Sequence, residues 1–196
     1  IDSILRTVAK GETLEGIVKK YGGNLSETLA FNGWSPGYEP EVGTIVIIPN
    51  GEGEPLTNFG TAVRGAGGPS YAGYYIRPIS GGRNSRATAS NPQGLHGFNG
   101  VDLAASCSTP VYASASGVVI IARNYGWNGG YGNYVVIAHS NGTQTVYAHL
   151  SQVFVSVGQY VPQGFVIGTI GSTGNSSGCH VHFEIRGAKM LSEIAR

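Results

Sequence analysis

The sequence predicts a mainly β protein, in which a small βααβ domain precedes a larger antiparallel β domain. Glycine accounts for 32 of the 196 residues, and only 12% of the residues are charged, about half the usual share of a soluble domain. From residue 73 onward, short β-branched and aromatic runs alternate with glycine and polar turns, without a helical periodicity of useful length. A chain of this length can form two small domains, each with its own core.

The first 50 residues predict a strand, two helices and a strand. Residues 5–8 alternate like a strand, and Thr13 can cap a first helix. Apolar residues follow at helical spacing: Leu14, Ile17, Val18 and Tyr21. Ser26 is the N-cap candidate of a second short helix, which is expected to end at Asn32. Residues 44–48 are a β-branched run, typical of a closing strand.

A change in composition separates this segment from the rest of the chain. Residues 50–55 break every periodicity, and residues 60–72 are rich in glycine, alanine and other small side chains. We therefore predict a first domain over residues 1–50, a linker over 51–72 and a second domain over 73–196.

The second domain reads as strand after strand. The expected strands are residues 110–113, 117–122, 134–138, 144–148 and 165–168. Asn141-Gly142 is the strongest hairpin signal in the sequence. The glycine-rich connections at 124–132 and 171–178 are expected to form the walls of a cleft.

The segment around His180 and His182 is the strongest chemical signal. Alternate residues of a strand face the same side, so these two imidazoles are expected about 7 Å apart, while Val181, Phe183 and Ile185 face a core. Such a pair can bind a metal ion with one ring and leave the other ring beside a metal-bound water. The alternative is two histidines on a solvated strand face.

Other histidines and an aspartate complete a possible metal site. His96 and Asp102 flank a glycine-containing loop, and with His180 or His182 they would supply the three ligands of a catalytic zinc site. Taken singly, His96 could be a plain loop residue and Asp102 a turn cap. His149, at a strand end, could be a surface hydrogen-bonding group, and His139 is expected to be structural.

Several classes of function and site are disfavoured. A net charge of about +1 provides no basic field for nucleic acid, and no apolar run is long enough to span a membrane. Residues 171–178 lack the lysine of a phosphate loop. No serine or cysteine lies in a nucleophile elbow.

The sequence contains two cysteines. Cys107 and Cys179 are either one disulfide, as an oxidising compartment allows, or two buried thiols.

The first 50 residues resemble a LysM module, a repeat that binds N-acetylglucosamine polymers. The matching blocks are Val8–Leu14, Ile17–Gly22, Leu29–Gly33 and Val42–Pro49. Glu12 stands where the family usually has Asp, and the loop holding Trp34 and Tyr38 is longer than usual. The resemblance implies that sugar lies between two loops, which include Gly11, Glu12 and Thr13 in the first and Asn32 and Trp34 in the second. Packing of Trp34 and Tyr38 within their loop is the alternative.

The second domain resembles zinc metallopeptidases of the lysostaphin type, which cut the peptide part of peptidoglycan. The matching blocks are Gly100–Ala105, Thr109–Ala113, Gly117–Val119, Gly132–Ile137, Tyr147–Leu150, Gly168, Gly171–Gly174 and His180–Glu184. The resemblance implies an antiparallel β-sheet peptidase domain of the duplicated hybrid motif type, with one Zn²⁺ per chain.

The resemblance also implies roles for individual residues. Asp102 and His182 would hold zinc, while His149 and His180 would act on water and the transition state. The usual spacing would place the remaining ligand at Phe98. We expect His96 to take that role instead, with the two extra residues bulging outward through Gly97 and Gly100. Glu184 could orient a ligand, although a solvated glutamate is the simpler expectation.

The expected function is zinc-dependent hydrolysis of peptidoglycan cross-links or stem peptides by a monomer held on glycan by the LysM-like module. The start at Ile1 without methionine suggests that a signal or anchor preceded it, and the expected location is extracytoplasmic, secreted or associated with a bacterial cell envelope. Two alternatives are a non-catalytic adaptor that activates a separate peptidoglycan amidase and a purely sugar-binding wall protein.

Overall fold

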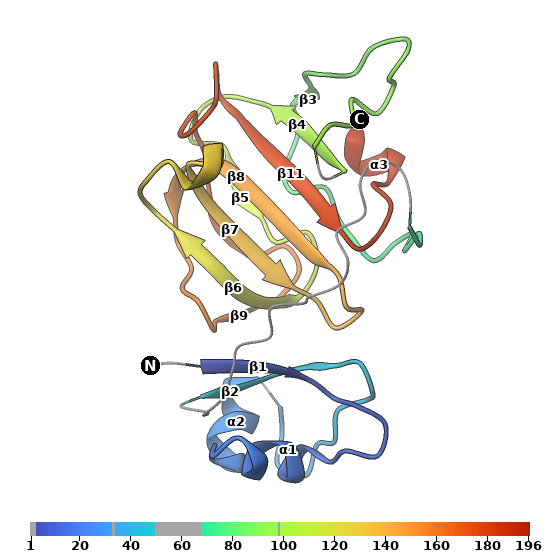
Figure 1. Cartoon of the computed structure of the whole chain (residues 1–196). Coiled ribbons are helices and arrows are strands. Elements are labelled where there is room, and N and C mark those ends of the chain that lie inside the picture. The colour runs from blue at the N-terminus through green and yellow to red at the C-terminus, as the bar shows by residue number, and fades with distance from the viewer. Residues whose placement is uncertain (1–2, 33, 50–67, 98) are drawn as a thin grey trace.

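The small N-terminal domain has the predicted βααβ order. A computed structural model describes residues 3–32, 34–49, 68–97 and 99–196. Strands β1 (Ser3–Thr7) and β2 (Ile45–Pro49) pair antiparallel, and helices α1 (Leu14–Lys20) and α2 (Leu25–Phe31) lie together on one side of the pair (Figure 1). Seven buried apolar residues form a separate small core: Val8, Leu14, Ile17, Val18, Leu29, Val46 and Ile48.

Local side-chain hydrogen bonds start the two helices. The Thr13 hydroxyl accepts a hydrogen bond from the Gly16 amide and caps α1, as predicted. The cap of α2 is Asn24, whose side chain accepts from the Glu27 amide, and the prediction of Ser26 was therefore wrong. Both residue types favour this position, and the helix begins two residues earlier than the hydrophobic pattern indicated.

The large domain is built on one antiparallel sheet. Its main path runs in the order β3, β4, β11, β8, β7, β6, β9, and β10 pairs with both β5 and β8. The bounds are β3 (Arg83–Asn84), β4 (Gly100–Ala104), β5 (Pro110–Tyr112), β6 (Gly117–Arg123), β7 (Asn133–Ala138), β8 (Gln144–Val153), β9 (Tyr160–Val161), β10 (Val166–Ile170) and β11 (His180–Arg186). Asn141-Gly142 joins β7 to β8, which confirms the predicted hairpin.

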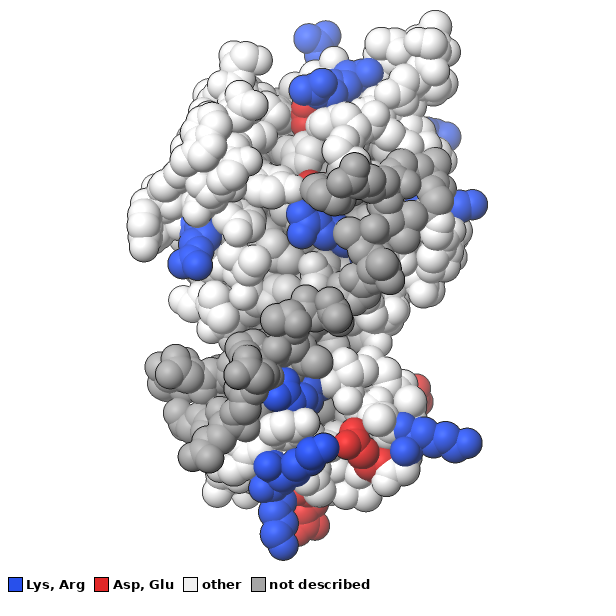
Figure 2. Space-filling view, viewed as in Figure 1, with Lys and Arg blue, Asp and Glu red and all other residues white. Residues whose placement is uncertain are grey.

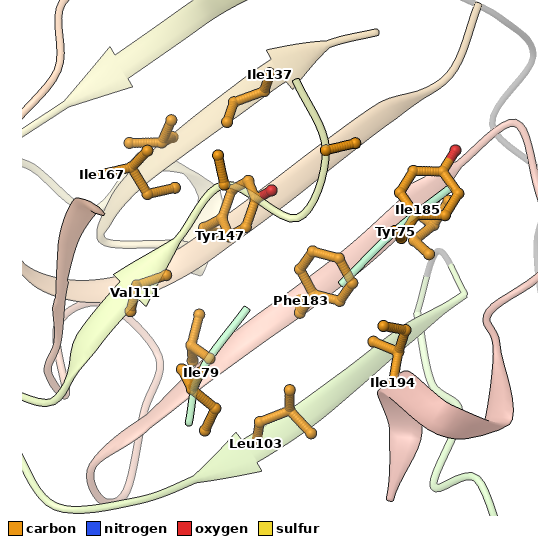
Figure 3. Close-up of a cluster of buried hydrophobic side chains, with 14 of the residues drawn as sticks. Tyr75, Ile79, Leu103, Val111, Ile137, Tyr147, Ile167, Phe183, Ile185 and Ile194 are labelled. Atoms are coloured by element: carbon orange, nitrogen blue, oxygen red, sulfur yellow. The ribbon is translucent and has the colours of Figure 1, made fainter. Parts of the chain in front are cut away.

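The core of this domain lies on one face of the central strands. Phe183 and Ile185 of β11 pack with Tyr147 of β8 and Leu103 of β4 (Figure 3). Val181, Phe183 and Ile185 are all fully buried, as the alternation predicted. Burial of each such side chain stabilises the fold by about 1.5–3 kcal/mol, so β11 is fixed in position by its apolar face and its polar face is free for chemistry.

The chain after β11 also belongs to this core. Ala188, Met190 and Leu191 are buried, and so is Ile194 of the short helix α3 (Ser192–Ala195). The sequence offered no motif here. The predicted linker falls largely on residues 50–67, which lie outside the described residues. The described end of the predicted linker contacts the large domain: the Pro69 carbonyl oxygen accepts a hydrogen bond from the Lys189 amide at 2.7 Å, and Tyr71 packs against the core.

Cys107 and Cys179 form a disulfide across 72 positions of sequence. It joins the loop after β4 to the residue that precedes β11. A closed loop of this size restricts the unfolded chain and contributes about 4 kcal/mol in the chain-entropy model. Of the two alternatives that the sequence left open, the structure therefore contains the bonded pair.

The surface carries few charges. On the face shown in Figure 2, basic side chains are scattered and do not gather into one patch. Within the described ranges, none of the helices has the length and hydrophobicity needed to cross a bilayer.

His139 is a structural residue, as predicted. It is fully buried, and its ring nitrogens contact the Ser116 carbonyl oxygen at 2.9 Å and the Thr145 hydroxyl at 2.8 Å. Burial lowers the pKa of His139 to about 4. His139 is therefore neutral in the folded protein at neutral pH, because no charged partner offsets the cost of desolvating an imidazolium.

We predict that the free energy of unfolding decreases as the pH falls from about 6.5 to 4. The unfolded chain gains a proton on His139 in this window while the folded chain does not, which costs up to about 3 kcal/mol. Denaturant unfolding of metal-free protein at several pH values measures the slope. A His139→Gln variant should show a flatter slope, and equal slopes for the two proteins would contradict the assignment.

Candidate metal centre

The register of β4 against β11 brings two candidate ligands together. The strands pair antiparallel with His182 directly opposite Asp102 and His180 opposite Ala104. Side chains at directly opposed positions lie on the same face of a sheet. His180, His182 and Asp102 therefore all point away from the core, into the same cleft.

A tight loop brings His96 to the same place. His96 and Gly100 exchange backbone hydrogen bonds of 3.0 and 2.9 Å, which fixes His96 beside the start of β4. Gly97 and Asn99 have positive φ values of 56° and 61°, a region open to glycine and tolerated by asparagine. The described residues Gly97 and Asn99 therefore have turn conformations between His96 and Gly100, and Phe98 lies outside the described residues.

Gly100 has a different role from the one predicted. The second left-handed residue is Asn99, whose side-chain amide donates to the Ala188 carbonyl oxygen at 2.7 Å. Gly100 instead lies in β4, where a Cβ atom would stand 2.6 Å from Cε1 of His182. Glycine at position 100 therefore provides room for the ligand ring and does not supply a turn.

Three donor atoms converge on one point. Asp102 Oδ1 lies 3.0 Å from His96 Nε2 and 2.8 Å from His182 Nδ1, and the two nitrogens are 3.0 Å apart. Among the described residues, His96, Asp102 and His182 are the group whose ligand atoms lie close enough to hold one metal ion. Two imidazoles and a carboxylate that leave a further position open are a common set for a catalytic metal ion.

Hydrogen bonds on the outer side of each ring fix which nitrogen faces the centre. His96 Nδ1 lies 3.0 Å from the Gly94 carbonyl oxygen, and His182 Nε2 lies 3.0 Å from Glu184 Oε1. A neutral imidazole has one N–H, and these two oxygens can only accept, so the proton lies on His96 Nδ1 and on His182 Nε2. The lone pairs of His96 Nε2 and His182 Nδ1 then point at the centre, as metal ligands require.

The protonation of the ligands reflects their closeness. Burial alone would raise the pKa of the Asp102 carboxyl, but hydrogen bonds from His182, His96 and Arg86 outweigh it and hold that pKa far below its usual range. Burial would lower the pKa of His182, whereas its bonds to Asp102 and Glu184 raise it to about 9. Asp102 is therefore ionised at neutral pH, and a metal ion that binds His182 Nδ1 takes the place of a proton.

Glu184 is buried, so the expectation of a solvated glutamate was wrong. Its side chain is 1% exposed. One carboxylate oxygen accepts from His182 Nε2 and from the Tyr131 hydroxyl at 2.7 Å, and the other accepts from Arg186 Nε at 2.6 Å. Burial and the nearby carboxylate raise the pKa of Tyr131 to about 12, so its phenol remains a donor. This network holds the His182 ring in place.

His149 reaches the cleft through a β-bulge. Ala148 and His149 of β8 stand opposite the single Tyr134 of β7, between the pairs Val135↔Tyr147 and Asn133↔Leu150. His149 has a φ of 62°. Tyr147 and Leu150 can both face the core because of this extra residue, and His149 lines the cleft.

His149 and His180 form a pair beside the three ligands. Their ring centroids are 4.7 Å apart. His149 Nδ1 lies 2.8 Å from the Thr173 carbonyl oxygen, and His180 Nδ1 lies 2.9 Å from the Gly178 carbonyl oxygen. Each ring thus donates its N–H to the backbone and keeps the lone pair of Nε2 for the cleft. Burial lowers the pKa of His149, which favours this neutral form.

The five groups line an open cleft of about 750 Å³. Its walls include Gly129 to Tyr131 on one side and Asn175 to Gly178 on another, which agrees with the predicted glycine-rich walls. Sequence reasoning missed Arg86, whose Nε donates to Asp102 Oδ2 at 2.5 Å, and the contribution of Tyr131. Both lie in loops without a periodic pattern, and the Gly-Gly-Tyr-Gly context of Tyr131 is the one signal that could have drawn attention to it.

The predicted sugar-binding residues lie in two neighbouring loops of the small domain. The Leu14 amide donates to Glu39 Oε2 at 2.9 Å, which ties the second loop to the end of the first. Asn32 is buried and donates to the Thr28 carbonyl oxygen, so its side chain serves helix α2. The Trp34 and Tyr38 rings contact each other at 5.0 Å, and Tyr38 is 42% exposed. Gly11, with a φ of 86°, turns the chain before Glu12 and Thr13.

Comparison with known families yields two matches. Residues 96–193 match the model of peptidase family M23, and residues 7–49 match the model of the LysM domain. The first range contains all five residues of the cleft that the sequence singled out, from His96 to His182. The second range covers both helices and both sugar-site loops.

Individual proteins show the same likeness. The peptidoglycan DD-endopeptidase ShyA of Vibrio cholerae is 47% identical over 87 residues, which are 44% of this chain and 20% of ShyA. The chain therefore spans about a fifth of that relative's length. YgeR, an uncharacterized lipoprotein of Escherichia coli, is 31% identical over 92% of this chain and 75% of its own. The catalytic domain of lysostaphin from Staphylococcus simulans is 33% identical, with 62% of this chain and 87% of that chain covered and a TM-score of 0.44.

We predict that Glu184→Gln weakens binding of a divalent metal ion about 10- to 100-fold, because the variant removes the negative charge that orients and polarises the His182 ring. Competition with a chromophoric chelator measures the affinity, and thermal unfolding checks that the variant is folded. Glu193→Gln, at an exposed position of α3, is the matched control and should bind as the parent does. Equal affinity for all three proteins would show that Glu184 has no effect on the site.

Proposed function

Because the chain belongs to peptidase family M23, we propose that it is a zinc-dependent endopeptidase that hydrolyses peptide bonds in the cross-links or stem peptides of bacterial peptidoglycan. The observation that carries the proposal is the convergence of His96, Asp102 and His182 in an open cleft, with two more imidazoles beside them. A metallopeptidase needs a set of metal ligands that leaves one coordination position open, and it needs groups that act as general acid and base.

The residues present fit one zinc ion. His96 Nε2, Asp102 Oδ1 and His182 Nδ1 are nitrogen and oxygen donors of the kinds that zinc prefers, and their outer atoms are all hydrogen-bonded. When bound, zinc supplies Lewis acidity, which polarises a carbonyl group and lowers the pKa of water toward 7. The chain must supply the transfer of protons and the positioning of the substrate.

His180 and His149 are suited to move protons. Both present a bare Nε2 to the cleft, because each Nδ1–H is donated to a backbone carbonyl oxygen. His180 Nε2 lies 3.7 Å from Asp102 Oδ1, next to the ligand cluster. We assign one ring as the general base that accepts a proton from the attacking water, and the other, once protonated, as a donor to the developing oxyanion.

The LysM domain would hold this activity on the cell wall. In this proposal Trp34 and Tyr38 stack on sugar rings between the loops that contain Gly11 to Thr13 and Asn32 to Tyr38, and the tether raises the local concentration of peptide stems. Asn32, Trp34 and Tyr38 line a cavity of about 360 Å³, to which the large domain also contributes residues that include Ser116 and Tyr160. A role beyond packing of the loop is supported by the exposure of Tyr38.

The same observations bear on location and on the alternatives. The disulfide between Cys107 and Cys179 supports an extracytoplasmic place, secreted or in the envelope of a bacterium. A non-catalytic adaptor has no need for three convergent ligands and two free imidazole lone pairs, so the enzyme is favoured over an amidase activator. The proposal includes a first domain over residues 1–50, a linker over 51–72 and a second domain over 73–196, in a chain that acts as a monomer.

We predict that His180→Ala and His182→Ala both strongly reduce hydrolysis of purified peptidoglycan but differ in metal content. His182→Ala removes a ligand and should lose zinc. His180→Ala should keep one zinc ion per chain and lose activity by about 10²- to 10⁴-fold, the usual contribution of a general acid or base. Mass spectrometry of released peptides and elemental analysis make the two measurements. An inactive parent protein that retains zinc would favour the adaptor.

We predict that Tyr38→Ala weakens retention on insoluble peptidoglycan roughly 5- to 150-fold, because loss of one stacking aromatic removes about 1–3 kcal/mol of contact. Hydrolysis of a short soluble cross-linked peptide should not change, since Tyr38 belongs to the small domain. Pelleting assays and peptide kinetics test both statements. Tyr125→Ala, which truncates a 74% exposed tyrosine of the large domain, is the matched control for retention.

A further inference from the structure

Arg86 is the one cationic side chain in the described lining of the cleft. Apart from the imidazoles and the carboxylates of Asp102 and Glu184, the remaining walls are neutral and include Gly129, Gly130, Asn175 and Ser177. The Arg86 side chain is 58% exposed although it contacts a carboxylate that is 7% exposed. A long cationic side chain in this position is thus open to a ligand in the cleft.

The guanidinium of Arg86 is only partly used by the protein. Its Nε donates to Asp102 Oδ2, whereas Asp102 Oδ1 faces His96 and His182. Arginine has four further N–H donors on its two terminal nitrogens, and among the described residues these have no hydrogen-bond partner. The Asp102 carboxylate therefore lies between the metal-ligand cluster and the two terminal nitrogens of Arg86, which can donate to a bound ligand.

The backbone that carries Arg86 is held against the site. The Ser85 amide donates to the Asp102 carbonyl oxygen at 2.9 Å, and the Arg86 amide donates to Asn84 Oδ1 at 3.0 Å. Asn84 in turn donates to the Gln93 and Ala195 carbonyl oxygens, both at 2.7 Å. Because the segment is anchored at three points, Arg86 is positioned before substrate arrives.

The charges of the site favour an anionic group beside the scissile bond. Glu184 is paired with Arg186, and Asp102 with Arg86. The inference rests on the proposed function, in which a divalent ion would add two positive charges that no further described carboxylate in the cleft offsets. An exposed guanidinium next to such a centre attracts carboxylates, which it can bind with two parallel hydrogen bonds.

We propose that Arg86 binds a substrate carboxylate located on the carbon that carries the scissile nitrogen. Two kinds of peptide have such a carboxylate. In the first, the scissile bond precedes the C-terminal residue. In the second, the bond is a cross-link to the amine of a diamino acid, and the carbon that holds this amine also holds a carboxylate. A bond inside a glycine bridge has none. Arg86 thereby selects the first two kinds of bond over the third.

The test compares pairs of synthetic peptides with the zinc-loaded full chain. Each pair is identical except that this carboxylate is free in one peptide and converted to the carboxamide in the other. The parent protein should prefer the free form by roughly 10- to 100-fold in kcat/KM, mainly through KM. In Arg86→Gln the preference should fall close to one. Arg83→Gln, at a neighbouring exposed position outside the cleft lining, should keep it.

The outcomes separate binding from a role through Asp102. If Arg86→Gln loses the same factor on the free and amidated peptides, the residue only positions Asp102 and the proposal is overturned. Equal cleavage of both forms by the parent overturns it as well. Cross-linked and C-terminal substrate pairs are measured separately, and dependence on Arg86 in either pair supports the proposal and identifies the source of the carboxylate.

A binding measurement keeps this inference separate from the peptidase proposal. Calorimetry with zinc-loaded His180→Ala should show tighter binding of the free carboxylate form by a similar factor, and the difference should vanish in His180→Ala combined with Arg86→Gln. If the parent protein hydrolyses neither peptide while this binding pattern is present, the result counts against the proposed peptidase activity and not against the role of Arg86. Equal binding of both peptides to both variants would count against the role of Arg86.

Discussion

The register between β4 and β11 is the constraint on which the site depends. It sets His182 opposite Asp102, and a shift by one residue would turn one of them into the core. The fully buried Val181, Phe183 and Ile185 make such a shift costly, since each would have to leave an apolar environment. The hydrophobic face of β11 thus determines where its chemical face lies.

Around this register, hydrogen bonds decide how each polar ring is used. His96, His149 and His180 all donate Nδ1–H to backbone carbonyl oxygens, whereas His182 donates Nε2–H to Glu184. The nitrogens that face the cleft are therefore Nε2 of His96, His149 and His180 and Nδ1 of His182, where a metal ion takes the place of a proton. The network of Glu184, Tyr131 and Arg186 shows that the buried charge of Glu184 is offset locally, so the site keeps an ionised carboxylate behind a ligand ring.

Much of this could be predicted from particular residues. Alternation along residues 180–185 gave the shared face of the two histidines, Asn141-Gly142 gave the hairpin, and the family-like blocks indicated both domains. Other features depend on contacts between distant segments. Glu184 looks like a solvated residue until His182, Tyr131 and Arg186 surround its carboxylate. Arg86 has no pattern that links it to Asp102, sixteen positions away.

The sequence by itself determined the β-rich class, the face of His180 and His182, and the types of ligand available, because these follow from periodicity and side-chain chemistry. Only the tertiary structure decided that His96 reaches the ligand cluster through the loop of residues 97–99, and that a bulge in β8 turns His149 into the cleft. Local pattern does not encode these outcomes, since the position of an extra residue depends on which neighbouring strand it packs against.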